Sequence, residues 1–422
     1  MTRIRRVELH HVRVPLPATF YPSWIPGFPQ RENRFDLIRV ITDDGVEGWS
    51  AGPAMSHERA GIGSVLAPYL IGEDPTDIDA MQQRLREVGY LGARQWWVEP
   101  AFWDIKAKLA GKPVYELLGG ERRRAVPVYC STGAVRRPED RVEEAERRYA
   151  EGFRAIKLRV HSFAETDDIA QVERTAEAVG DRMKIGVDVN QGWRVAAISD
   201  APRWDLARAK RFVDACADAG LAWVEEPLPM DDYAAQVALR EHSRVPISGG
   251  EIHTGGLPEL KMMIERGCYD IYQPDAIFTG GIAQTMEVAR LCRAHDVLYT
   301  PHTWTNGVGF AVNLQLMAAS GFADAKELEY PYDPPGWVEE ARDGILTAPF
   351  LHRRGEVELP TRPGLGFEID RRALKKWGTR TFVMDRLRMV FFGLKDRGLR
   401  GAREIDRARR ARRAGKKPDP AR

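Results

Sequence analysis

The chain has 422 residues, of which 43% are hydrophobic and 29% charged, and its formal net charge at pH 7 is +2. This length and apolar content are enough for two domains with separate cores. No stretch approaches the ~20 apolar residues of a membrane span, and the start of the chain, Met1–Val7, lacks the apolar core of a secretory signal. We therefore expect a cytoplasmic protein with no membrane partner.

Residues 1–125 predict an α+β domain. Two strands are expected, followed by a helix whose apolar residues recur at three- and four-residue steps and then by a longer helix that ends at a glycine pair. The strands are Val7–Val14 and Phe35–Thr42. The first helix carries the apolar residues Ile78, Met81, Leu85 and Val88, and the longer helix is Pro100–Leu118. Between the two strands, the aromatic and turn-rich segment Phe20–Pro29 is expected to form a lid loop.

Residues 126–335 alternate strand and helix patterns over about 200 residues, which is typical of a parallel α/β barrel. Eight strands are predicted from the apolar runs: Val126–Ser131, Ala155–Val160, Lys184–Val189, Ala222–Glu226, Ile247–Glu251, Ile271–Asp275, Val297–His302 and Glu327–Tyr330. Active sites of such barrels lie where the strands end, so polar residues at those ends are the candidates for function.

Residues 336–378 are turn-rich and are expected to return to the first domain, whereas 379–422 form a basic tail. Residues 371–422 carry 19 Lys and Arg against 5 Asp and Glu. The tail predicts a solvated helix that frays into disorder, and Phe382–Phe392 could be an amphipathic helix docking on the body or on another subunit. Basic clusters attract phosphate, but no aromatic interleaving or motif supports nucleic-acid binding.

Three carboxylates, Asp188, Glu225 and Glu251, end successive predicted strands at spacings of about one β/α unit. In a barrel these side chains converge, and their mutual repulsion calls for a divalent cation. Oxygen-only ligands suit Mg²⁺. The alternative is that the three acids are unrelated and each caps the helix that follows it.

The second predicted barrel strand alternates apolar and basic residues, which places Lys157 and Arg159 on the face opposite Ile156 and Leu158. If the apolar face packs against the helices, both cations point into the barrel. Buried cations are costly unless they are paired, so this location favours a functional role over a structural one.

Asp275 and His302 end the sixth and seventh predicted strands, and Glu329 ends the eighth. Neighbouring strands would place the Asp275 carboxylate beside the His302 imidazole, orienting it as a general base. Glu329, next to a substrate carboxylate, would have to be protonated or hydrogen-bonded. The set describes abstraction of a proton next to a carboxylate, with cations stabilising the enediolate.

Taken in order, these residues resemble the enolase superfamily, specifically its mandelate racemase subgroup. The likeness runs from Val7 to about Trp377 and includes Phe102-Trp-Asp-Ile-Lys-Ala-Lys, Lys157-x-Arg159, Asp188-x-Asn190, Glu225-Glu-Pro227, Gly250-Glu251, Gln273-Pro-Asp275, His302 and Glu329. It implies an N-terminal capping domain over a (β/α)₇β barrel. It further implies Asp188, Glu225 and Glu251 as Mg²⁺ ligands, with His302 as base and Asp275 as its partner.

One position departs from the pattern, because racemases of the subgroup usually carry a second lysine where this chain has Arg159. A guanidinium stays protonated and is a poor base. One good base suffices to dehydrate a sugar acid, an aldonate or aldarate, to a 2-keto-3-deoxy acid. Lys157 is a candidate for a second base. The alternative function is therefore a racemase, epimerase or cycloisomerase acting on a 2-hydroxy carboxylate.

Specificity is expected from residues around the barrel mouth. Tyr21 and Trp24 belong to the lid, and Asn190, His253 and Trp304 each lie two residues past a site residue. We expect all five to contact a small-molecule carboxylate substrate. For His253 and Trp304 the sequence favours a role in supporting the site equally. A homo-oligomer is the expected assembly.

Overall fold

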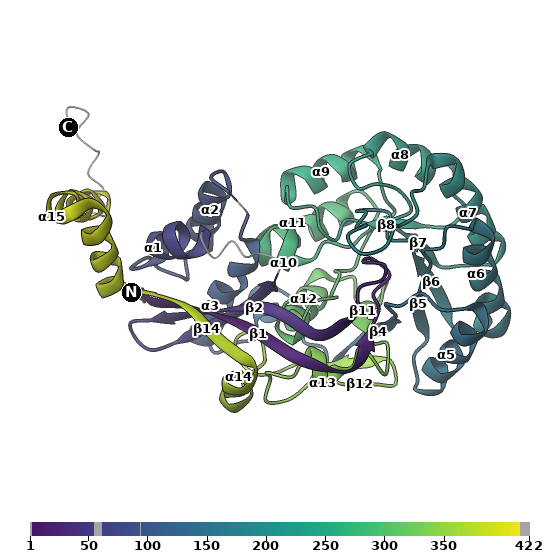
Figure 1. The fold of residues 1–422 in the computed structure, drawn as a ribbon, viewed down its shortest axis with the longest axis horizontal. Helices are drawn as coiled ribbons and strands as arrows, with labels where there is room; N and C mark the ends of the chain where they lie inside the picture. The colour runs from purple at the N-terminus through teal and green to yellow at the C-terminus, as the bar shows by residue number, and fades with distance from the viewer. Residues whose placement is uncertain (1, 55–60, 93, 414–422) are drawn as a thin grey trace.

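The computed structural model describes residues 2–54, 61–92 and 94–413, which form a capping domain beside a larger barrel (Figure 1). The capping sheet is antiparallel with the strand order β14-β1-β2-β3. Its strands are β1 (Ile4–Phe20), β2 (Gln30–Thr42), β3 (Glu47–Pro53) and β14 (Gly378–Asp385). The two predicted strands are therefore parts of longer ones, the middle of β1 and the C-terminal part of β2, and β3 had no prediction.

The capping helices partly match their predicted pattern. In α2 (Ile78–Gly89) the four apolar residues of the predicted face are all buried. The single helix predicted over 100–118 was wrong, since the structure has α3 (Pro100–Leu109) and α4 (Val114–Leu117). Gly111 between them is left-handed, with φ of 67°, and Pro113 lacks the N–H that a continuing helix would need. The described part of this domain also contains the π-helix η1 (Gly61–Leu66), the single turn α1 (Ala67–Leu70) and the 3-10 helix η2 (Trp96–Val98).

Strand β14 corrects the predicted boundary at residue 379, because residues 378–385 belong to the capping sheet and not to a tail. Met384 pairs with Val7 and Phe382 with Leu9, so the strand covers the free edge of β1. Phe382–Asp385 is thus strand, and the helix α15 (Arg386–Arg413) begins only after it.

The second domain is the predicted (β/α)₇β barrel. Seven parallel strands follow one another in chain order, and the eighth pairs with the first. They are β4 (Ala125–Ser131), β5 (Ala155–Arg159), β6 (Lys184–Asp188), β7 (Trp223–Glu225), β8 (Ile247–Gly249), β9 (Ile271–Tyr272), β10 (Leu298–Tyr299) and β11 (Leu328–Pro331). Six observed strands, β5 to β10, end before the predicted ones. In β8, β9 and β10 the difference is two or three residues, so Glu251, Asp275 and His302 lie just beyond the strands.

Helices surround the barrel strands (Figure 1). They are α5 (Pro138–Ala150), α6 (Glu165–Val179), α7 (Leu206–Asp218), α8 (Tyr233–His242), α9 (Leu257–Arg266), α10 (Ala276–Thr279), α11 (Gly281–Ala294) and α12 (Gly307–Ser320). The chain then passes through α13 (Glu339–Arg342), the hairpin β12 (His352–Arg353) and β13 (Glu356–Glu358), and α14 (Arg371–Trp377). None of the helices in the described ranges is long and apolar enough to cross a bilayer.

A buried carboxylate joins the two domains. Glu99, fully buried at the start of α3, accepts hydrogen bonds from the backbone N–H groups of Ile282 (2.8 Å) and Ala283 (3.1 Å) in the first turn of α11. Unpaired N–H groups and the helix dipole make this end of a helix a favourable place for negative charge. The contact fixes the capping domain against the barrel.

The barrel interior below the site is filled by the apolar cluster of Tyr129, Ala155, Trp223 and Ile271. The Trp223 indole, stacked edge-on against Tyr129, fits only because Gly186 has no side chain, since a Cβ there would lie 2.0 Å from the ring. Gly186 and Trp223 each precede a strand-end carboxylate by two residues, so they support the floor of the site.

We expect Gly186→Ala to lower the free energy of unfolding by about 1–3 kcal/mol, the usual cost of overpacking a filled core. Chemical denaturation of the two proteins measures the difference. Gly92→Ala is the matched control, since a Cβ at Gly92 would meet nothing within 4 Å. Equal stability of the Gly186 variant and the wild type would show that the Trp223 indole can move aside at no cost.

Candidate active site

Strand register brings the central charged residues together. Arg159 on β5 is the direct partner of Asp188 on β6, which in turn is the partner of Glu225 on β7. Residues in register on parallel strands point to the same face of the sheet. The barrel mouth therefore holds a cation and two carboxylates side by side, as the strand-end pattern predicted.

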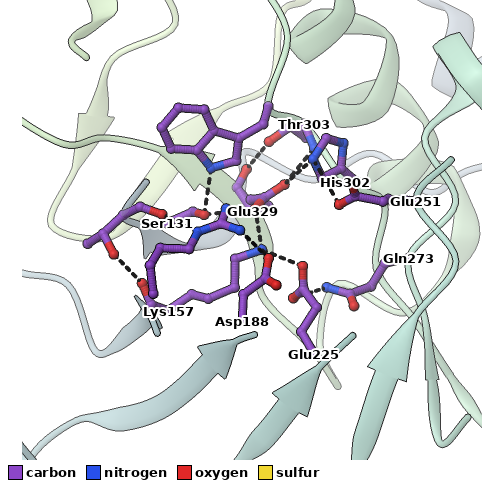
Figure 2. Close-up of polar contacts among 12 residues, drawn as sticks. Ser131, Lys157, Asp188, Glu225, Glu251, Gln273, His302, Thr303 and Glu329 are labelled. Atoms are coloured by element: carbon purple, nitrogen blue, oxygen red, sulfur yellow. Dashed lines mark hydrogen bonds and ion pairs between the residues drawn. The ribbon is translucent and has the colours of Figure 1, made fainter. Parts of the chain in front are cut away.

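Lys157 lies one layer deeper and is completely buried. Its Nζ donates to Glu225 Oε1 at 2.6 Å, forms an ion pair with Glu329 Oε1 at 2.7 Å and lies 3.5 Å from Asp188 Oδ2 (Figure 2). Burial alone would lower the pKa of this lysine, but Glu225 and Glu329 outweigh it and raise the pKa above its ordinary value. Lys157 is therefore a permanent cation bridging three acids.

Arg159 is buried as well, and its guanidinium donates to three different residues. It pairs with Asp188, donates from Nε to the Thr132 carbonyl at 2.7 Å and reaches Asn190 Oδ1 at 3.2 Å. The rings of Trp24 and Trp304 lie 5.3 Å and 5.7 Å from its central carbon. The alternation that predicted both cations pointing inward agrees with these contacts.

Negative charge exceeds positive charge at this end of the barrel. The cations Lys157 and Arg159, together with the His302 imidazole described below, lie among six buried acidic side chains: Asp188, Glu225, Glu226, Glu251, Asp275 and Glu329. Burial, with repulsion from Glu225 and Glu251, raises the pKa of Asp188 to about 7 against the opposing effect of the two cations. Oxygen donors in excess of the available positive charge fit a hard divalent cation such as Mg²⁺.

In the conformation seen here the acids are engaged with the cations. Lys157 holds Glu225 and Arg159 holds Asp188, and the described residues contain no group of three His, Cys, Asp or Glu side chains arranged to hold a metal ion. Asp188, Glu225 and Glu251 would hold Mg²⁺ only if their free oxygens turned toward one another. The donor chemistry fits the ion, and the ligand assignment is a proposal.

His302 and Asp275 form the predicted pair. His302 Nδ1 lies 3.1 Å from Asp275 Oδ2, and its Nε2 lies 3.3 Å from Glu251 Oε2. Asp275 is held in turn by Asn313, whose Nδ2 donates to Oδ1 at 2.8 Å. Burial lowers the pKa of His302, but Glu251, Glu329 and the bond to Asp275 outweigh it and raise the pKa to about 10. Asp275 thus holds the ring at Nδ1. Figure 2 shows His302 directed toward Glu251 and Glu329.

Glu329 lies between the cations and the imidazole. Its Oε1 accepts from Ser131 Oγ at 2.8 Å, and its Oε2 accepts from the Thr303 backbone N–H at 2.7 Å and lies 3.9 Å from His302 Nε2. Burial raises the pKa of Glu329, yet Lys157 and His302 outweigh it and lower the pKa to about 2. Of the two states that the sequence allowed, the structure supports the hydrogen-bonded carboxylate and not the protonated acid.

The lid loop reaches the barrel mouth through Ser23. Its Oγ donates to Asn190 Oδ1 at 2.6 Å and its backbone N–H donates to the Gly133 carbonyl at 2.9 Å. Trp24 packs on Trp304, with ring centroids 5.0 Å apart. Tyr21 is 54% exposed at the outer side of the loop. Asn190, Trp24 and Trp304 therefore come together above Arg159, whereas Tyr21 does not join them.

His253 has a supporting contact. It is buried, and its Nδ1 lies 2.9 Å from Glu259 Oε1 on α9, which ties the loop after β8 to that helix. Trp304 also has a partner, since its Nε1 donates to Ser131 Oγ at 2.7 Å. In both residues the contact agrees with the supporting role that the sequence left open.

Several polar residues hold the site together through contacts that the sequence did not predict. Ser131 and Ser23 end or follow long strands, Gln273 Nε2 donates to Glu225 Oε2 at 2.8 Å, and Trp193 Nε1 donates to Glu251 Oε1 at 3.4 Å. Gln273 belongs to the quoted motif Gln273-Pro-Asp275 but was given no role; its spacing of two residues from Asp275 places it on the same face of the strand end and could have suggested one. Ser131 and Ser23 have no such signal, because their partners lie more than 160 residues away.

Comparisons with known proteins identify the family. Residues 10–119 match the family model for the mandelate racemase/muconate lactonizing enzyme N-terminal domain, and residues 140–373 match the enolase C-terminal domain-like model. The chain belongs to the enolase superfamily. Within it, the mandelate racemase subgroup predicted from the motifs is confirmed, as are the capping domain and the barrel of that fold.

Two relatives within this superfamily are D-galactarolactone cycloisomerase of Agrobacterium fabrum and L-talarate/galactarate dehydratase of Salmonella typhimurium. The first is 31% identical over 83% of this chain and 94% of its own, and the second is 30% identical over 83% of each. A solved structure, L-talarate dehydratase from Polaromonas sp. JS666 complexed with Mg and L-glucarate, superposes with a TM-score of 0.75 at 26% identity. It covers 91% of this chain and 99% of its own.

Proposed function

We propose that this enolase-superfamily protein is a Mg²⁺-dependent acid-sugar dehydratase that converts an aldonate or aldarate to a 2-keto-3-deoxy acid. The observation that carries the proposal is a single His–Asp pair, His302 with Asp275, on one side of Glu329, with permanent cations on the other side. Relatives named as D-xylonate, D-galactonate and arabinonate dehydratases support the reaction class.

In this reaction the neutral imidazole of His302 removes, at Nε2, the proton on the carbon next to the substrate carboxylate. The ring would become neutral when a bound cation offsets the negative charge of Glu251, which raises the pKa of His302 in this structure. Asp275 and Asn313 hold the ring in place from the Nδ1 side. The electron pair left by the C–H bond becomes an enediolate, and Lys157 and Arg159 supply positive charge for it. Bound Mg²⁺, held by Asp188, Glu225 and Glu251, would add further positive charge at the carboxylate oxygens.

The enediolate then expels the β-hydroxyl. The imidazolium of His302 is an acid that can return the abstracted proton to the departing oxygen, which leaves as water. The remaining enol takes up a proton at carbon, gives up the proton of its hydroxyl group and becomes the 2-keto acid. Ser131 and the Thr303 N–H keep Glu329 ionised and oriented next to these groups.

The contacts of Lys157 and Arg159 favour one base over two. A racemase or epimerase needs a base on each face of the α-carbon. Lys157 Nζ is committed to Glu225 and Glu329 within hydrogen-bonding distance and is completely buried, while Arg159 cannot deprotonate. His302 is therefore the base.

A cycloisomerase is the second candidate, because the relative at 31% identity is a D-galactarolactone cycloisomerase. The same proton abstraction would serve it, with a ring oxygen leaving in place of water. Incubation of the purified protein with Mg²⁺ and a library of aldonic acids, aldaric acids and their lactones distinguishes the two. We expect a product that lacks one water and traps as a 2-keto acid. A product of unchanged mass from a lactone would assign the second function instead.

Arg159→Lys tests whether the guanidinium acts through its geometry or its charge. The lysine keeps a cation but cannot bond Thr132, Asp188 and Asn190 at once. We expect turnover to fall roughly 10- to 100-fold, the equivalent of one charge-assisted hydrogen bond, with solvent exchange of the α-proton retained. Unchanged turnover would mean that charge alone is needed, and loss of exchange would place Arg159 in the proton transfer itself.

A further inference from the structure

The helix α15 lies beyond the residues matched by the family models, which end at residue 373. Figure 1 shows it at the end of the molecule away from the barrel helices α6 to α8, joined to the body through β14. Between residues 386 and 413 the chain has 11 Lys and Arg against 3 Asp and Glu. This element is thus a basic addition to the enzyme fold and touches none of the site residues described above.

The element is a helical hairpin. Gly398, with φ of 67° and ψ of 178°, interrupts the helix. A Cβ built on Gly393 would lie 3.9 Å from Ala402 Cβ, whereas residues nine apart along a straight helix are separated by about 13.5 Å. The two segments therefore fold back on each other, and the small residues allow the close approach.

The first segment exposes an apolar stripe. Leu387, Val390, Phe391 and Leu394 follow the three- and four-residue spacing of one helix face, and Leu387 and Phe391 are 84% and 63% exposed. Met389, which points the opposite way at 100° per residue, packs against the core of the body. The helix face that carries Met389 thus packs against the body, and the opposite face with the apolar stripe is exposed to solvent.

Cations border the stripe on both sides. At 100° per residue, Arg386 and Arg397 lie along one edge and Arg388 and Lys395 along the other, and all four are exposed. An apolar face with basic edges is the pattern of helices that lie in the interface of a bilayer with anionic headgroups. The apolar residues enter the acyl boundary while the cations meet the headgroup phosphates.

We propose that α15 binds the surface of an anionic lipid bilayer through this stripe and tethers the enzyme to it. Two other occupants fit less well. The same helix of a second copy would bring the basic edges against each other. A nucleic acid would use the cations but offers no hydrocarbon layer for Leu387 and Phe391. The proposal departs from the expectation of no membrane partner, since it concerns a helix that lies on a bilayer and does not cross it.

Sedimentation with lipid vesicles tests the proposal on the full-length protein. We expect binding to vesicles of phosphatidylcholine mixed with phosphatidylglycerol, weakening as salt is raised, and little binding to phosphatidylcholine alone. The double variant Phe391→Ser and Leu394→Ser should bind at least about tenfold more weakly, because two apolar side chains no longer enter the lipid. Leu91→Ser, an exposed leucine on the body, is the matched control and should bind as the wild type does.

Unchanged thermal unfolding and turnover of the double variant would show that only the surface has changed. Equal binding to both vesicle types, no binding to the anionic vesicles, or full binding by the double variant would each overturn the proposal. So would a light-scattering experiment in which the wild type is an oligomer without lipid and the double variant dissociates, because the stripe would then be covered by a second copy.

Discussion

Replacing His302 with Asn should abolish both turnover and the exchange of the substrate α-proton with solvent deuterium. Asparagine can still donate a hydrogen bond toward Asp275 but cannot accept a proton. The expected loss of rate is at least the ~10²–10⁴-fold that a positioned general base contributes. Exchange is followed by NMR in deuterium oxide and turnover by formation of the 2-keto acid.

The matched control for this experiment is His242→Asn. His242 Nε2 lies 3.1 Å from both carboxylate oxygens of Asp214 at the barrel surface, so the substitution removes the same imidazole from a His–Asp pair outside the site. Turnover and exchange should be retained. If the His302 variant still exchanged the α-proton of one stereoisomer, a second base such as Lys157 would be acting, and the protein would be an epimerase or racemase.

Removal of divalent metal should eliminate activity, and Mg²⁺ should restore it. Even with the His302 imidazolium counted beside Lys157 and Arg159, the six buried acidic side chains leave negative charge at the barrel mouth, where the substrate adds another carboxylate. Mg²⁺ should also raise the stability of the substrate-free protein, by about 2.7 kcal/mol when it is present at 100 times its dissociation constant. Treatment with EDTA, followed by calorimetric titration with Mg²⁺ and thermal unfolding, measures binding independently of turnover.

Glu251→Gln locates the metal within the site. The amide keeps the size of the side chain but removes a charged ligand, so Mg²⁺ affinity should fall and the stabilisation by Mg²⁺ should shrink. Glu327→Gln is the control, because this carboxylate precedes β11 at the opposite end of the barrel and pairs with Lys184. Full activity of metal-free enzyme, or an equal response of both variants, would overturn the ligand assignment.

The sequence by itself determined the residues at the barrel mouth. Side chains alternate along a strand and parallel strands end at one edge, so a run such as Ala155–Arg159 fixes the inward direction of Lys157 and Arg159 without knowledge of any partner. The same rule placed Asp188 and Glu225. These predictions depend only on local periodicity and on the order of the strands, and both can be read from the amino-acid sequence.

Only the tertiary structure decided contacts between segments far apart in the chain. Strand β14 forms because β1 offers a free edge to residues 378–385, and nothing in that segment alone distinguishes a strand from the start of the helix that follows. Ser131 meets Glu329, and Ser23 meets Asn190, through closure of the barrel and folding of the lid. The protonation state of Glu329 likewise follows from the approach of Lys157 and His302, because a pKa is set by neighbours in space.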